Sequence, residues 1–206
     1  MYNIHKGETC LIVGNGSSLK KIDDDFLKKY KTFGTNRCYL KFVPDYYVCV
    51  NPLVLEQNQD DIRKLESVKF VRDTVSMDAY PLHKGTFTDF SFEPLKWVNE
   101  GYTVTHVCLQ LAYWMGFETV LLVGVDHDYK YHGGENQTQV MTEDDPNHFD
   151  PNYFKGQTWQ TPDLKRSEKY YLAARRVFEK DNRKIINLTP RTKLEVFEKD
   201  NIKKWS

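Results

Sequence analysis

The sequence has no excess charge of either sign, because 29 Lys and Arg residues balance 29 Asp and Glu residues. A basic surface that would attract nucleic acid or an anionic membrane is therefore not expected. No apolar run approaches the roughly 20 residues that a membrane-spanning helix requires, and the first residues do not resemble an apolar secretion signal. We expect a cytoplasmic protein without a transmembrane segment that binds no nucleic acid.

Cysteine is scarce and shows none of the paired spacings typical of a zinc site. The four cysteines are Cys10, Cys38, Cys49 and Cys108. Three of them lie in apolar segments, where a free thiol behaves as a small hydrophobic group. We therefore expect reduced cysteines in the core, as is usual for a cytoplasmic protein.

Residues 10–18, around which the chain is organised, resemble two phosphate-binding fingerprints but match neither completely. An apolar run, Cys10–Val13, enters a turn whose residues are Gly14, Asn15, Gly16, Ser17 and Ser18. The third glycine of a dinucleotide fingerprint is missing, and no Gly-Lys-Ser/Thr of a Walker A loop follows. A glycine turn that leads into a helix still presents free amides, which favour an anion. We expect the turn to bind a nucleotide phosphate; an ordinary turn capped by Ser17 or Ser18 is the alternative.

Hydrophobic periodicity predicts one α/β domain over residues 1–206, with a mostly parallel central sheet flanked by helices. Strands are expected at 9–13, 32–35, 45–50, 68–72, 119–123 and 184–187, with short strands near 86–92. Helices are expected at 52–65, 103–115 and 163–180, and residues 17–30 are helical or turn-like. Residues 127–162 are polar and aperiodic, which favours a functional, lid-like insertion. The tail from residue 188 is polar.

Polar side chains follow the predicted strands where each one ends. They are Asn15, Asn36, Asn51 and, after the later strand, Asp126. Ligands of open α/β sheets bind at the carboxyl ends of the strands, and an amide can both donate and accept hydrogen bonds. Thr103 and Thr105 begin the strongest predicted helix, where hydroxyls and free amides can hold a phosphate. The alternative is a structural role, because Asn is common in turns and Thr is common at helix caps. We expect Asn15→Ala to remove nucleotide binding and to leave the melting temperature nearly unchanged.

The polar insertion supplies three candidate general bases, His127, His132 and His148. A titratable imidazole over a cleft suits that role. Carboxylates there offer oxygen ligands for a divalent metal, and Asp126 and Asp128 are the candidates if the reaction needs Mg²⁺. A solvated loop with incidental histidines is the alternative.

Several motifs together resemble the domain-of-unknown-function-115 family. They are Gly-Asn-Gly-Ser-Ser-Leu at 14–19, Thr-Asn-Arg at 35–37, Val-Asn-Pro at 50–52, and the segment 103–126 that ends in Gly-Val-Asp. That family includes proteins of surface-polysaccharide gene clusters, motility-associated flagellin glycosyltransferases and archaeal 6-hydroxymethylpterin pyrophosphokinases. The pattern is similar, more distantly, to bacterial sialyltransferases that use CMP-sialic acid. The resemblance covers residues 9–196 and implies a GT-A-like variant of the Rossmann fold.

The resemblance to sialyltransferases also implies roles for individual residues. The contacts to nucleotide or donor sugar would be Asn15, Asn36, Asn51 and Asp126. Residues 103–105 would line the phosphate and cytidine, although Val104 stands where those enzymes carry serine. His148 is the best counterpart of their catalytic histidine.

Three functions remain open at this point. The first is a glycosyltransferase of surface-glycan biosynthesis that needs no cofactor. It would move a sugar from a nucleotide donor, with CMP the expected nucleotide, to a hydroxyl of a glycan or small-molecule acceptor. The second is a Mg²⁺-dependent pyrophosphokinase that moves diphosphate from ATP to a pterin-like alcohol. The third is a non-catalytic nucleotide- or glycan-binding module. Whether the chain forms a homo-oligomer is also open.

Overall fold

The structure is a computed structural model that describes residues 1–206. Its centre is an eight-stranded sheet, ordered β10-β9-β6-β1-β2-β3-β4-β5, in which all neighbouring strands are parallel. The strands are β1 (Thr9–Val13), β2 (Lys31–Thr35), β3 (Tyr46–Cys49), β4 (Val68–Arg72), β5 (Tyr80–Leu82), β6 (Thr119–Val123), β9 (Lys184–Asn187) and β10 (Glu198–Lys199). The predicted α/β class, a Rossmann-like fold with a parallel central sheet flanked by helices, is confirmed.

Strand order reverses beside β1, the strand next to the middle of the sheet. From β1 the chain moves outward through β2, β3, β4 and β5, and it then returns to the other side of β1 with β6 and β9. Val13 at the end of β1 pairs with Val123 at the end of β6. Such a reversal places a ligand crevice just beyond these two residues.

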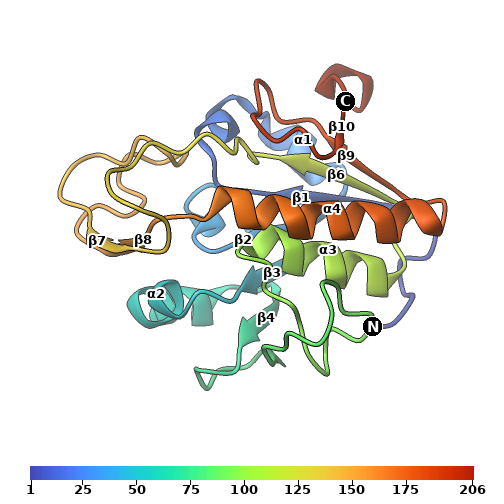
Figure 1. Ribbon diagram of the computed structural model, residues 1–206, viewed down its shortest axis with the longest axis horizontal. Helices are drawn as coiled ribbons and strands as arrows, with labels where there is room; N and C mark the ends of the chain where they lie inside the picture. The colour runs from blue at the N-terminus through green and yellow to red at the C-terminus, as the bar shows by residue number, and fades with distance from the viewer.

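Helices cover both faces of the sheet. In Figure 1, α3 (Val104–Met115, green) and α4 (Leu164–Lys180, orange) run side by side across one face. The opposite face packs against α1 (Asp24–Lys28), α2 (Pro52–Lys64) and the 3-10 turn Ser17–Lys21. Two further 3-10 turns span Cys38–Leu40 and Ile202–Lys204. The insertion carries a small antiparallel pair, β7 (Thr138–Val140) and β8 (Thr158–Gln160), at one end of the molecule (Figure 1).

The apolar residues of the strands explain these two layers. Side chains along a strand point alternately to its two faces, so Cys10 and Ile12 belong to the core under α3 and α4. Leu11 and Val13 belong to the core on the other face. All four are fully buried, as expected for a parallel strand covered on both sides.

Most predicted elements match the structure, and the differences have physical causes. The helix predicted at 103–115 begins after its N-cap Thr103 and ends at Gly116, whose φ of 95° is left-handed. The strands predicted near 86–92 are wrong, because that stretch is irregular, and the strand β5 was missed. The polar tail is also more ordered than its composition suggests, since Leu194 and Phe197 are buried in the core.

Burial of His106 makes stability depend on pH. Its Nε2 donates to the Asp89 carbonyl oxygen, 2.9 Å away, and burial lowers its pKa to about 4. The unfolded chain binds this proton near pH 6.5, so acid favours unfolding between the two values. Urea unfolding should be measured at pH 7.5 and pH 5.0 for wild type and His106→Gln. As the pH falls, the free energy of unfolding should decrease by about 2 kcal/mol more in wild type than in the variant. Equal losses would contradict this prediction.

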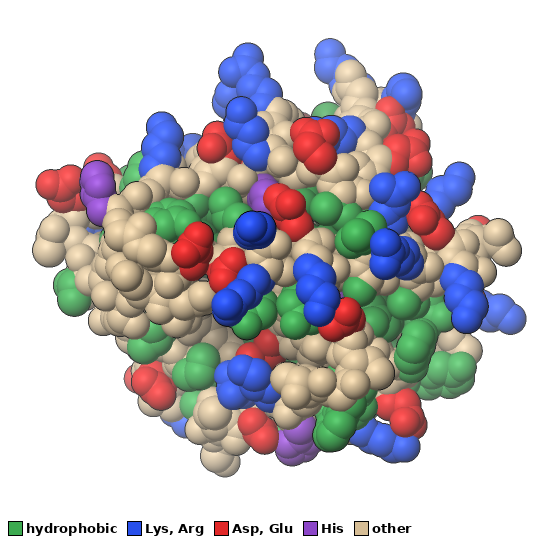
Figure 2. Space-filling model, in the orientation of Figure 1, with side chains coloured by type: hydrophobic (Ala, Val, Ile, Leu, Met, Phe, Trp, Pro, Cys, Tyr) green, Lys and Arg blue, Asp and Glu red, His purple; other side chains and the backbone are tan.

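The face formed by α3 and α4 carries no field of one sign. Figure 2 shows acidic and basic side chains interspersed across it, with apolar atoms between them. Among the helices of this structure, none combines the length and the apolar character needed to span a bilayer.

Candidate functional site

A cleft of about 640 Å³ lies beyond the carboxyl ends of β1, β2, β3 and β6, bordered by α3, α4 and the insertion. Ten predicted site residues line it: Gly14, Asn15, Asn36, Asn51, Thr103, Val104, Thr105, Asp126, His127 and His148. Five predicted site residues do not line it: Gly16, Ser17, Ser18, Asp128 and His132. The strand-end asparagines therefore come together, as the strand-end argument requires.

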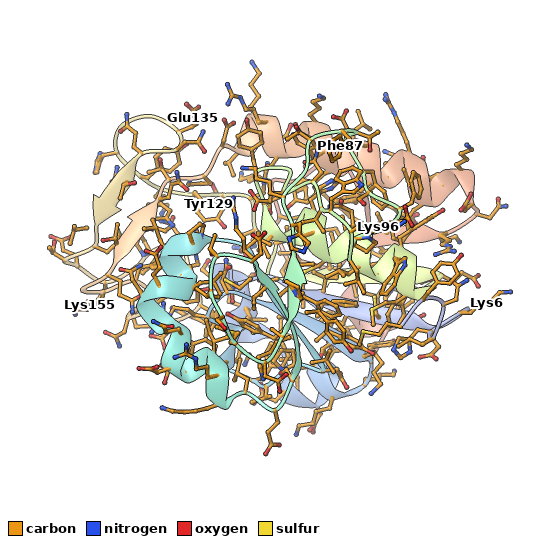
Figure 3. The ribbon with its side chains drawn as sticks, turned by 90° about the horizontal axis from the view of Figure 1, so that it is seen from below. Lys6, Phe87, Lys96, Tyr129, Glu135 and Lys155 are labelled. Carbon is orange, nitrogen blue, oxygen red and sulfur yellow. The ribbon has the colours of Figure 1, made fainter.

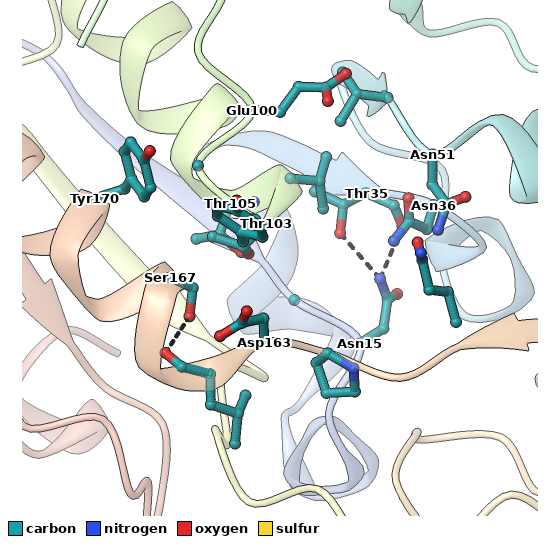
Figure 4. A pocket seen from close by; sticks show the side chains of 18 of the residues that line it. Asn15, Thr35, Asn36, Asn51, Glu100, Thr103, Thr105, Asp163, Ser167 and Tyr170 are labelled. Atoms are coloured by element: carbon teal, nitrogen blue, oxygen red, sulfur yellow. Dashed lines mark hydrogen bonds between the residues drawn. The ribbon is translucent and has the colours of Figure 1, made fainter. Parts of the chain in front are cut away.

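Asn15 has one half of its amide fixed and the other half free (Figure 4). Its Nδ2 donates to the Thr35 carbonyl oxygen at 3.0 Å and to Thr35 Oγ1 at 2.9 Å. Its Oδ1 is buried and has no partner. A buried acceptor without a donor is uncommon in folded proteins, so this oxygen is suited to accept a hydrogen bond from a ligand.

The bonds to Thr35 revise the expected result of Asn15→Ala. The substitution removes the Asn15 donor from two buried Thr35 oxygens, while the Thr35 hydroxyl keeps its 3.4 Å bond to the Val13 carbonyl oxygen. It should lower the free energy of unfolding by about 1–3 kcal/mol, not leave it unchanged. With CMP, the nucleotide expected from the sequence, the affinity should fall about 2- to 10-fold, as for one hydrogen bond. Thr35→Val is the matched control, because it removes a partner of Nδ2 and leaves Oδ1 in place. In that control, thermal unfolding should show lower stability, and calorimetric titration should show unchanged CMP affinity.

The turn at residues 14–18, the first turn, already binds the carboxylate of another residue of the protein. Asp126 accepts hydrogen bonds from the Ser18 amide at 3.2 Å and from the Ser18 hydroxyl at 2.8 Å. Burial raises the pKa of Asp126 above its ordinary value, and the bonds from Ser18 oppose the shift. Ser17 is exposed. The structure therefore does not direct Ser18 toward a ligand phosphate, because Ser18 anchors Asp126 instead. Neither serine side chain caps the turn.

The two carboxylates considered for Mg²⁺ do not converge. Both oxygens of Asp126 are engaged by Ser18, while Asp128 is exposed and lies outside the cleft. No group of three or more His, Cys, Asp or Glu side chains is arranged to hold a metal ion. These residues do not fit a preformed magnesium site.

Three helix N-termini face the cleft. Asn51 caps α2 by accepting from the Leu53 amide at 3.0 Å, and Thr103 caps α3 by accepting from the Thr105 amide at 3.3 Å. Asp163 caps α4, with its carboxylate accepting from the Arg166 amide at 3.0 Å. Helix N-termini carry partial positive charge, so the cleft is favourable for an anionic group.

His148 is held by a buried carboxylate at the edge of the cleft. Its Nδ1 lies 2.7 Å from Asp145 Oδ2, and both side chains are almost fully buried. The ring stacks on Tyr153 with centroids 4.2 Å apart. A proton on Nδ1, shared with Asp145, leaves Nε2 as a free acceptor, and Nε2 has no hydrogen-bond partner in the protein. This arrangement fits a general base whose tautomer is set by a carboxylate.

The other two candidate histidines are placed differently. His127 lines the cleft, but its Nε2 lies 3.0 Å from Glu168 Oε1 on α4. His132 is exposed and lies outside the cleft. Of the three, His148 alone combines cleft exposure with an unpaired ring nitrogen and a buried carboxylate partner.

Comparison with known proteins gives one match. The model of a protein family described as "6-hydroxymethylpterin diphosphokinase MptE-like" matches residues 1–132 of the 206. The chain belongs to the MptE-like family. No curated protein and no solved structure matches it. The family name suggests a transferase, and the matched region of this MptE-like protein ends before His148 and Asp145.

In this MptE-like protein the insertion is attached to the first turn. The Phe149 amide donates to the Asn15 carbonyl oxygen at 3.0 Å, and Gly16 forms an antiparallel bridge with His148. Farther along, Gln57 of α2 accepts from the Thr158 amide at 2.7 Å. Figure 3 shows α2 and the β7–β8 pair on the same side of the molecule, with Tyr129 near them. The insertion is thus packed against the domain and places His148 beside Asn15.

Four charged residues of the cleft were missed by the sequence reasoning. Arg72, Lys84, Glu100 and Asp163 all line it. Arg72 is the last residue of β4, so the strand-end rule that selected the asparagines could have found it. Lys84 and Glu100 lie in irregular backbone, where no periodic pattern marks their position.

Proposed function

We propose that this MptE-like protein is a transferase that moves a sugar from a CMP-linked donor to an acceptor hydroxyl, with His148 as the general base. The observation that carries the proposal is the buried His148–Asp145 pair, placed beside the unpartnered oxygen of Asn15 at the cleft. Hydroxyl activation requires a base within hydrogen-bond reach of the hydroxyl, and a ligand held by Asn15 would lie next to His148.

Each part of the cleft has a role in this reaction. The free Oδ1 of Asn15, with Asn36 and Asn51, would bind the nucleotide or the donor sugar. The N-terminus of α3 would stabilise the phosphate charge as the sugar leaves. His148 Nε2 would accept the proton of the acceptor hydroxyl, while Asp145 stabilises the imidazolium that forms. No cofactor is assigned to this reaction.

A second candidate is the transfer of diphosphate from ATP to a pterin-like alcohol, which the family's printed name favours. That chemistry uses a divalent metal to neutralise phosphate charge. Mg²⁺ usually keeps several waters and takes one or two carboxylates together with substrate phosphates. Asp126 could contribute through the lone pairs that its two hydrogen bonds from Ser18 leave free.

A thermal-shift panel separates the candidates. It would contain CMP, CMP-sialic acid, CDP, UDP and ATP, each with and without Mg²⁺, and transfer assays would follow for any ligand that binds. A ligand at about 100 times its dissociation constant adds about 2.7 kcal/mol to stability. A response to cytidine monophosphates without metal supports sugar transfer, and a response to ATP with Mg²⁺ alone supports diphosphate transfer. Ligand binding without turnover under any condition would support a binding module.

A further inference from the structure

We infer that Arg72 and Lys84, beside the N-terminus of α3, form the subsite for the phosphate of the nucleotide ligand. This inference rests on the proposed function, because it concerns the same cleft, and it names the residues that distinguish a nucleotide from a nucleoside. The sequence patterns offered two places for a phosphate: the first turn, where Asp126 is already bound to Ser18, and the start of α3. They did not point to Arg72 or Lys84.

The geometry joins the two cations to the helix. Arg72 Nη1 lies 2.9 Å from Glu100 Oε1, and Lys84 Nζ lies 3.1 Å from Glu100 Oε2. The carbonyl oxygen of Glu100 accepts from the amide of Thr103, the N-cap of α3, at 3.0 Å. Glu100 therefore holds both cations close to the positive end of α3, and Figure 4 shows Glu100 on the same side of the cleft as Thr103.

The charges in this cluster are not balanced. Two cations share a single carboxylate, which leaves one net positive charge next to a helix N-terminus. Arg72 Nε is buried and has no hydrogen-bond partner. Glu100 Oε1 forms an ion pair with Arg72 but no hydrogen bond. An arginine has five N–H donors, so most of its donors remain for a second acceptor. A phosphate, which arginine can bind through two parallel hydrogen bonds, satisfies that need.

The other helix ends of the cleft are less suitable for a phosphate. The N-terminus of α4 is occupied by the carboxylate of Asp163, which would repel a second anion. The first residue of α2 is Pro52, which has no N–H to donate. The cap of α3 is the neutral hydroxyl of Thr103, and the two cations lie beside it.

The test compares CMP with cytidine, which differ only by the phosphate. Dissociation constants of both ligands would be measured by calorimetry for wild type, Arg72→Gln and Lys84→Gln. Each substitution should weaken CMP roughly 10- to 100-fold, as for a hydrogen bond to a charged group, and should leave the affinity for cytidine unchanged. Lys96→Gln is the control, because Lys96 is exposed and pairs only with Glu93. It should change neither constant.

A folding defect can be separated from a binding defect. Arg72→Gln leaves the half-buried Glu100 paired with Lys84 alone. The double variant Arg72→Gln/Glu100→Gln removes this carboxylate together with the arginine that it held. The inference predicts that this double variant folds and still discriminates less between CMP and cytidine. The inference would be overturned if the ratio of the dissociation constants for CMP and cytidine were unchanged in all of these variants. It would also be overturned if the affinities for both ligands fell equally.

Inorganic pyrophosphate distinguishes failure of this inference from failure of the proposed function. If wild type binds pyrophosphate and Arg72→Gln does not, the phosphate subsite stands even if cytidine is not recognised. If CMP binds equally well to wild type and to the variants, the subsite is wrong and the proposed function is unaffected. If neither CMP nor pyrophosphate binds to wild type, the subsite is refuted.

Discussion

His148→Ala should lower kcat by about 100- to 10,000-fold, which is the usual contribution of a positioned general base. The affinity for the nucleotide should change little, because His148 is assigned to the acceptor hydroxyl. The measurement is initial-rate kinetics with the donor that the thermal-shift panel identifies, together with calorimetric binding of CMP. A variant that keeps wild-type kcat would remove His148 from the mechanism.

Two further variants make this prediction specific. Asp145→Asn keeps the shape of the side chain but removes the negative charge 2.7 Å from His148 Nδ1, so it should also reduce kcat and leave CMP binding intact. His132→Ala is the matched control from the same insertion, since His132 is exposed and outside the cleft. Its kcat should equal that of wild type, and a comparable loss in all three variants would indicate a general disturbance of the insertion.

Gly14→Ala should destabilise the fold by about 1–3 kcal/mol or more, because it overpacks the point where β1 and β6 end. A methyl carbon at this position would lie 2.5 Å from the Gly124 carbonyl oxygen. That oxygen belongs to the backbone and cannot rotate away. Gly14 is also fixed on its other side, since its amide donates to the Val123 carbonyl oxygen at 2.8 Å.

The effect can be read from thermal unfolding, where each kcal/mol corresponds to roughly 2–4 °C for a domain of this size. Gly134→Ala is the control, because the nearest atom to its added carbon is the flexible end of Gln137 at 3.2 Å. It should stay within about 0.5 kcal/mol of wild type. If Gly14→Ala is as stable as this control, the two turns approach less closely than the structure indicates.

The sheet was predictable from the sequence because its strands are apolar on both faces. Strands such as β1 and β6 are continuous runs of buried residues between polar turns, and helix α3 has a clear cap at each end. β5 was not predictable, since Tyr80–Leu82 has only three residues, contains a proline and has one buried side chain. The ordered structure of the tail was not predictable either, because its buried residues Leu194 and Phe197 lie among charged residues and form no periodic pattern.

The site was predictable only where a local rule applies. The rule that ligands bind at strand ends selected Asn15, Asn36 and Asn51, and all three line the cleft. The glycine turn predicted a phosphate at the first turn, but the partner of Ser18 is Asp126, which lies 108 positions later in the sequence. A contact of that kind depends on how β1 and β6 pair. The link between Arg72, at the end of β4, and Glu100 likewise depends on tertiary structure and not on a local pattern.

The attachment of the insertion also bears on the entropy of ligand binding. Phe149, Tyr153 and Trp159 belong to the same buried cluster as Leu11 and Val13 of β1. Ordering of this part of the insertion therefore occurs when the domain folds, and a ligand does not have to order it again. Since the immobilisation of loops and side chains opposes association, a cleft built before the ligand arrives can bind a small nucleotide through few contacts.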